Sequence, residues 1–86
     1  MLTGTAIISA AQGLHARPAG ELVKLAKSFT GSRVTIDNGV KVVNAVSMLS
    51  LLSLGLKKGT EVSVSVEGGD EAAAVAAIVE FLNSFD

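Results

Sequence analysis

The chain of 86 residues contains no cysteine, tryptophan or tyrosine, and its aromatic content is limited to three phenylalanines. The lack of cysteine excludes a disulfide framework and thiol chemistry, and it suits a reducing compartment. So few aromatic side chains provide a poor surface for stacking on nucleic-acid bases. A formal net charge of -1 gives no electrostatic preference for nucleic acid or a membrane surface. We therefore expect no nucleic-acid partner.

Long hydrophobic runs are also missing. The longest apolar stretch, residues 48–56, is interrupted by serines and is far shorter than a membrane span. The first residues lack the charged segment and apolar run of a secretory signal. These absences predict a cytoplasmic protein without membrane insertion. With 49% hydrophobic and 17% charged residues, we expect a single globular domain over residues 1–86.

The single proline and the single histidine both lie in the segment Gly13–Ala19, which reads GLHARPA. Proline is tolerated in a first helical turn, so the segment predicts a helix from about Ala16, with His15 near its N-cap. The unpaired amides and the positive end of the helix dipole then favour an anion beside the imidazole. Arg17 adds a fork of donors that suits phosphoryl oxygens. The pattern predicts that His15 accepts a phosphoryl group.

Metal and nucleotide chemistry have little support in the sequence. There is no second histidine, no cysteine and no clustered pair of carboxylates to hold a metal ion. A Walker-type nucleotide loop is missing as well. We therefore expect no metal and no other cofactor, and we expect a covalent relay rather than an independent enzyme.

Hydrophobic periodicity predicts four strands and three helices in the order β-α-β-β-α-β-α. The strands are expected at 2–9, 33–37, 40–44 and 61–67, and the helices at 16–29, at 47–53 and after Asp70. Asn38-Gly39 is expected to form a hairpin turn because both residues accept positive φ. Ser47 should cap the short helix and Gly55 should end it. Strands with one apolar face need a covering layer, which the two long helices can provide.

The segment Gly13–Ala19 resembles the active-centre signature of the HPr family, the histidine-containing phosphocarrier proteins of the bacterial sugar phosphotransferase system. The motifs Val43–Met48 and Ser53–Leu56, with Gly59, are similar too, so the resemblance covers nearly the whole chain. It implies an α+β fold, an open-faced β-sandwich with a four-stranded antiparallel sheet covered on one face by helices. It also implies a phosphoenolpyruvate-dependent phosphoryl carrier with enzyme I as donor and sugar-specific enzyme II A domains as acceptors. In that family the acceptor atom is Nδ1.

Ser47 is a candidate regulatory site. In the Gram-positive proteins that the chain resembles, a dedicated HPr kinase/phosphorylase modifies the matching serine, which implies this kinase and a catabolite-control regulator as further partners. An added phosphate is well tolerated at a helix N-terminus. Val46 stands where that pattern usually has lysine, and Leu49-Ser50 replaces Met-Gly. These departures leave regulation at Ser47 open.

Partners are expected to dock around His15. Leu14, Ala16 and Gly20 place small or apolar surface beside the imidazole. The short helix at 47–53 holds more large apolar residues than it can bury, which predicts an exposed apolar patch. We assign to this patch the side chains of Met48, Leu49 and Leu52.

Two other functions fit the same residues. A regulatory interaction module controlled by phosphorylation of Ser47 would have no need of a histidine nucleophile. A carrier for a nitrogen-related or dihydroxyacetone branch would use His15 in the same way. A freely diffusing monomer suits either carrier.

Overall fold

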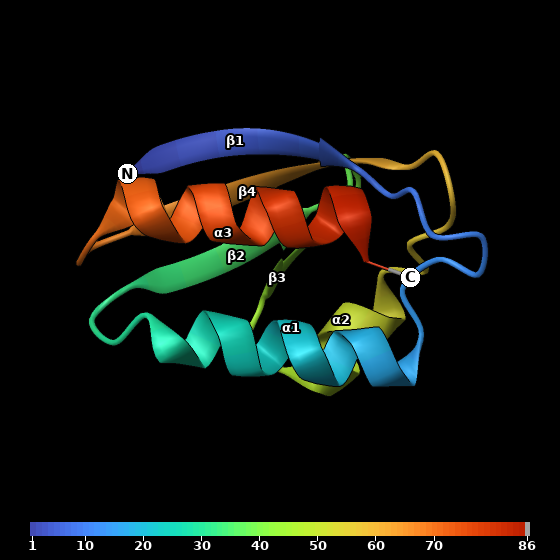
Figure 1. Cartoon of the computed structure of the whole chain (residues 1–86), viewed down its shortest axis with the longest axis horizontal. Helices are drawn as coiled ribbons and strands as arrows, with labels where there is room; N and C mark the ends of the chain where they lie inside the picture. Colours follow the sequence, from blue (N-terminus) through green and yellow to red (C-terminus); the bar gives the residue numbers. More distant parts are fainter. Residues whose placement is uncertain (86) are drawn as a thin grey trace.

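The computed structural model describes residues 1–85 and has the expected order of elements (Figure 1). The strands are β1 (Leu2–Ile7), β2 (Arg33–Asp37), β3 (Val42–Asn44) and β4 (Glu61–Glu67). The helices are α1 (Ala16–Ser28), α2 (Met48–Ser53) and α3 (Glu71–Ser84). The prediction of a β-α-β-β-α-β-α chain is confirmed. Among the described residues, no helix is long and apolar enough to cross a membrane.

The four strands form one antiparallel sheet in the order β1-β4-β2-β3. Successive side chains of a strand point to opposite faces, so β4 buries Val62, Val64 and Val66 while its serines stay partly exposed. Helix α3 packs over β1 and β4, and α1 packs beside α3 and α2 on the same side (Figure 1). The other face of the sheet is open, as expected for an open-faced β-sandwich.

The core lies between the sheet and the helices and is mainly aliphatic. Its largest fully buried side chains include Ile8, Leu22, Ile36, Leu51, Ile78 and Leu82. Each such side chain contributes about 1.5–3 kcal/mol through its removal from water. The buried side chains of α3, among them Ile78 and Leu82, therefore hold this helix against β1 and β4.

The sequence predicts that the third strand starts at residue 40, but β3 begins at Val42. The reason is local hydrogen bonding: Asn38 Oδ1 accepts from the backbone amides of Val40 and Lys41, at 3.0 and 2.8 Å. These bonds fold residues 38–41 into the hairpin connection. Gly39 has a φ of 93°, whereas Asn38 keeps a negative φ, so the expectation of positive φ at both residues is wrong for Asn38.

Strand β1 ends at Ile7 rather than at Ser9. The amide of Ile7 donates to Asn83 Oδ1 of α3 at 2.9 Å, and the Ser9 hydroxyl donates to the carbonyl of Asn83 at 2.7 Å. The last turn of α3 therefore holds the end of β1, where the chain leaves the sheet for the loop that precedes His15.

Candidate functional site

His15 is the N-cap of α1, as predicted. Its backbone is extended, with φ −106° and ψ −173°, and its carbonyl accepts from the amide of Ala19 at 2.9 Å. Within the described chain its exposed imidazole makes no capping hydrogen bond. The free amides at the start of the helix are those of residues 15–17, because Pro18 has none. These donors stay available to an anion near the ring.

The loop in front of His15 is tied to the segment that follows α2. The amide of Leu14 donates to the carbonyl of Leu56 at 2.9 Å, and the amide of Gly13 donates to that of Ala10 at 3.0 Å. Gly13 has a φ of 68°, and a Cβ at this position would collide with the carbonyl oxygen of Leu56. Glycine is therefore required here by both conformation and space.

The structure corrects our expectation for Leu14. Its side chain is only 7% exposed and belongs to the core, so it offers little surface to a partner. An apolar side chain buried directly before an exposed histidine anchors the loop and holds His15 at the helix start. Leu14 therefore stabilises the position of His15 from the core.

His15 and Arg17 face the same open cleft, between the first turn of α1 and the last turn of α3. The cleft has a volume of about 430 Å³, and its lining consists of His15, Arg17, Pro18, Glu21, Phe81 and Phe85. Figure 1 shows these two helix ends side by side at the same end of the molecule. An exposed imidazole and an exposed guanidinium thus share one open space, which the exposed carboxylate of Glu21 also borders.

Three of these lining residues were missed as parts of the site. The sequence gives no reason to place Glu21, Phe81 or Phe85 beside His15, yet all three border the cleft. The rings of Phe81 and Phe85 stack, with centroids 5.4 Å apart and planes 8° apart. Their i, i+4 spacing predicts that they meet on one helix face, but it does not indicate that this face borders His15.

The short helix α2 leaves part of its apolar surface exposed. Leu51 and Leu54 are buried, whereas Met48, Leu49 and Leu52 are 39%, 81% and 36% exposed. The prediction that this helix cannot bury all of its large apolar side chains is confirmed. Helix α2 packs against α1, so this apolar patch lies on the element next to the helix that carries His15.

Ala16 and Gly20 leave little bulk on the N-terminal half of α1. Ala16 is exposed, and Gly20 is half-buried. A Cβ added at Gly20 would have no described atom within 4 Å, so packing inside the molecule does not require glycine there.

Ser47 caps α2, as expected. Its hydroxyl accepts from the amide of Ser50 at 3.3 Å, and the side chain of Asn44 accepts from the amide of Val46 at 3.1 Å. Gly55, with a φ of 61°, follows the C-cap Leu54 and stops the helix. The Ser47 side chain is half-exposed.

The clearest electrostatic perturbation lies far from His15, at the start of α3. The amide of Gly68 donates to Glu71 Oε2 at 2.8 Å, and the N-terminal ammonium lies 3.2 Å from the same oxygen. The hydrogen bond from Gly68, followed by that from the N-terminus, lowers the pKa of the Glu71 carboxyl. Because α3 ends at the cleft and begins at Glu71, this pair belongs to the opposite end of the molecule (Figure 1).

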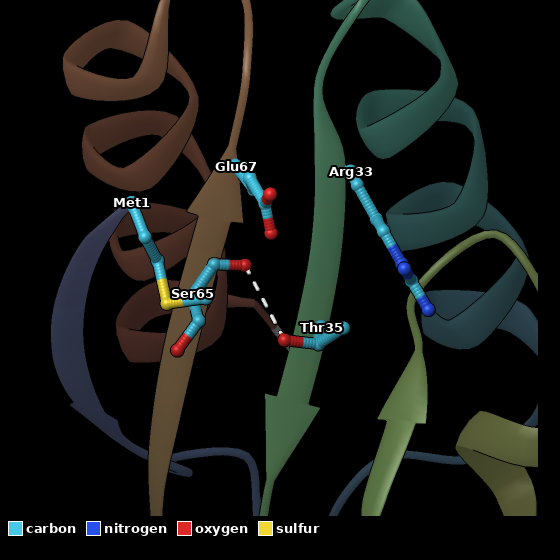
Figure 2. Close-up of a pocket in the computed structure, with 5 residues that line it drawn as sticks. All are labelled: Met1, Arg33, Thr35, Ser65 and Glu67. Atoms are coloured by element: carbon cyan, nitrogen blue, oxygen red, sulfur yellow. Dashed lines mark hydrogen bonds between the residues drawn. The ribbon is translucent and has the colours of Figure 1, made fainter.

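A second, smaller hollow of about 180 Å³ lies on the open face of the sheet (Figure 2). Its lining comprises Met1, Arg33, Thr35, Ser65 and Glu67. Figure 2 shows Arg33 extending away from Glu67, and the Thr35 hydroxyl donates to the carbonyl of Ser65 at 3.5 Å. Among residues 1–85, no three His, Asp or Glu side chains gather where they could hold a metal ion.

Comparison with known proteins decides the family. The family model "PTS HPr component phosphorylation site" matches residues 2–84, and so includes His15 and every described helix and strand. The chain belongs to the HPr family. The resemblance seen in Gly13–Ala19 is thereby confirmed, and the chain is a phosphocarrier of the phosphotransferase system (PTS) by family.

Individual relatives agree over nearly the full length. The chain is 39% identical over 85 residues to the phosphocarrier protein HPr of Borreliella burgdorferi, covering 99% of this chain and 98% of the relative. It is similar to the crystal structure of HPr-C-His from Thermoanaerobacter tengcongensis, with a TM-score of 0.88, 39% identity and coverage of 95% and 91%. The HPr structure from Bacillus anthracis gives a TM-score of 0.88 at 30% identity, with coverage of 94% and 95%. The α+β open-faced fold is therefore that of the HPr proteins.

Proposed function

We propose that His15 accepts a phosphoryl group from phosphorylated enzyme I and passes it to sugar-specific enzyme II A domains. The observation that carries this proposal is the exposed imidazole at the N-cap of α1, which shares an open cleft with Arg17. A helix N-terminus favours an anion through its free amides and its dipole.

The transfer proceeds by attack of a ring nitrogen of His15 on phosphorus. The nitrogen lone pair forms the N–P bond while the bond from phosphorus to the donor breaks, and the donor keeps that electron pair. Arg17 and the free amides of α1 stabilise the negative charge on the three phosphoryl oxygens. The acceptor then attacks the same phosphorus, the N–P bond breaks, and the ring nitrogen regains its lone pair.

An open site suits a carrier that must meet two partners in turn. The imidazole lies at the surface, so each partner brings its own reacting group to it, and the protein acts as a relay rather than an independent enzyme. Ala16 and Gly20 allow close approach on α1. The apolar patch of Met48, Leu49 and Leu52 offers a second contact area on α2.

A second proposal concerns Ser47, whose half-exposed hydroxyl caps α2. Phosphorylation there by an HPr kinase/phosphorylase would place a charge beside the partner surface, and a catabolite-control regulator would read it. A Ser47→Ala variant separates the two proposals. It should lose this modification and keep transfer through His15, whereas His15→Ala should lose transfer and keep any partner binding that depends on Ser47.

The decisive test uses purified, active enzyme I and phosphoenolpyruvate. The wild-type chain should gain a single acid-labile, base-stable phosphate, detected by intact mass, and His15→Ala should gain none. Because the His15 side chain is exposed, its replacement should leave folding intact, which thermal unfolding will check. A wild-type chain that takes no phosphate from active enzyme I would contradict the proposal.

A further inference from the structure

Two of the three aromatic side chains of this protein line the cleft that holds His15. We propose that Phe81, backed by Phe85, forms an apolar wall that restricts water around a phosphoryl group on His15 and so lengthens the life of the phosphorylated protein. This inference rests on the proposed function of His15.

The wall is held in place by its own helix. Phe85 is 8% exposed, and its amide donates to the carbonyl of Phe81 at 2.9 Å across the last turn of α3. Phe81 is partly buried, and its ring stacks on that of Phe85. Leu82, between them in the chain, is fully buried in the core. The ring of Phe81 is therefore fixed with part of its surface facing the cleft.

The rest of the cleft lining does not exclude water in the same way. Arg17 and Glu21 are charged and exposed, so they remain hydrated. Pro18, in the first turn of α1, is buried. Phe81 is thus the large apolar side chain that borders the space next to the imidazole without being buried itself. An apolar surface at this position lowers the number of water molecules that can reach the phosphorus.

The reaction that the wall opposes is hydrolysis of the carrier. In that step a water oxygen forms a bond to phosphorus as the N–P bond breaks, and the ring nitrogen keeps the electron pair. The proton of the water is released, the products are inorganic phosphate and unmodified His15, and the phosphoryl group is wasted. A carrier that diffuses between partners has to survive this reaction during transit.

The test compares the lifetimes of phosphorylated Phe81→Ala and wild-type protein. Each is phosphorylated chemically with phosphoramidate, freed of reagent, and followed at neutral pH by intact mass. Removal of the ring opens one side of the cleft, and we expect hydrolysis to become about threefold faster, equivalent to about 0.65 kcal/mol of barrier. Chemical phosphorylation makes the readout independent of enzyme I docking.

Phe29→Ala is the matched control. Phe29 is also a partly buried phenylalanine packed on the core, but it follows the far end of α1, away from His15. Its loss should leave the lifetime unchanged at a temperature where all variants are folded. Phe81→Leu keeps apolar volume and covers the case in which Phe81→Ala does not fold, with an expected lifetime between those of the wild type and Phe81→Ala.

The outcomes separate this inference from the proposed function. Equal lifetimes of the phosphorylated wild type and of every folded, phosphorylated Phe81 variant would contradict the role proposed for Phe81. They would leave the proposed function of His15 unaffected. Equal acceleration by Phe29→Ala and Phe81→Ala also contradicts the role proposed for Phe81, because general loosening then explains the effect. A wild-type chain that takes phosphate neither from phosphoramidate nor from enzyme I overturns the function, and the inference with it.

Discussion

The amide of Leu14 donates to the carbonyl of Leu56 at 2.9 Å, which joins the loop before His15 to the segment after α2. The proposed partner surface has two parts, the start of α1 at His15 and the exposed apolar patch on α2. This bond joins the segments next to them and so fixes one part relative to the other. The position of His15 therefore depends on residues that are more than forty positions apart in the chain.

Gly13→Ala should disturb this junction. The new Cβ would meet the carbonyl oxygen of Leu56, and the residue would keep a φ of 68°. Gly39→Ala is the control, because Gly39 also has positive φ, 93°, but no described atom lies within 4 Å of its Cβ. The control should lose about 1–2 kcal/mol of unfolding free energy from conformation alone, and Gly13→Ala should lose more. Equal losses in urea unfolding would show that the contact with Leu56 is unimportant.

Replacement of Arg17 should slow transfer without unfolding the protein. Its guanidinium is exposed in the cleft, so Arg17→Ala should change stability by no more than about 0.5 kcal/mol. Loss of a preorganised donor to the transferring group should lower the phosphorylation rate by about 10²-fold. Arg17→Lys should recover part of this rate, because lysine keeps the charge but not the fork of donors. Rapid-quench kinetics with enzyme I measures the rates, and an unchanged rate for Arg17→Ala would refute the role given to Arg17.

Gly20→Ala should stabilise the protein and weaken partner binding. Alanine is about 1 kcal/mol better than glycine inside a helix, and the added methyl has open space at this position. The same methyl would protrude from α1 where we propose that partners approach. The expected result is a higher melting temperature with a raised KM for phosphorylation by enzyme I. Stabilisation without any change in KM would remove Gly20 from the partner surface.

Glu71 should give the protein a pH-dependent contribution to stability. Its folded-state pKa is lowered from the ordinary value of 4.5, first by the hydrogen bond from Gly68 and then by the N-terminus. The stabilisation is therefore fully present above the unfolded-state pKa and is lost as the pH falls through the lowered folded-state value. Glu71→Gln should be less stable than wild type at neutral pH, and the difference should shrink in acid. Urea unfolding over a pH series measures this, and a difference that is constant with pH would exclude the linkage.

The elements of the fold could be predicted because their signals are local. The alternation of valine and serine from Glu61 to Glu67 predicts a strand with one buried face, and the structure confirms it. The caps at Ser47 and Asp70 follow from hydroxyl and carboxylate oxygens that reach amides three residues on, and both are present. The start of α1 at Ala16 is also predicted by a local signal, because proline is tolerated in the first turn of a helix and Pro18 lies there.

Other features depend on contacts between distant segments, which periodicity does not reveal. The burial of Leu14 results from the docking of its loop on Leu56, and the GLHARPA motif alone does not distinguish a buried leucine from an exposed one. Phe81 joins the cleft because α3 ends beside the start of α1, an arrangement set by the order of strands in the sheet. The late start of β3 reflects the side-chain bonds of Asn38, which compete with strand pairing.

The most direct test follows the imidazole itself. His15 is the only histidine of the chain, so selective ¹⁵N labelling of histidine gives signals from one ring. The two ring-nitrogen signals should shift when enzyme I and phosphoenolpyruvate are added, and they should return to their original positions when an enzyme II A domain removes the phosphate. A chain that gains phosphate while both nitrogen signals stay unchanged would contradict the account.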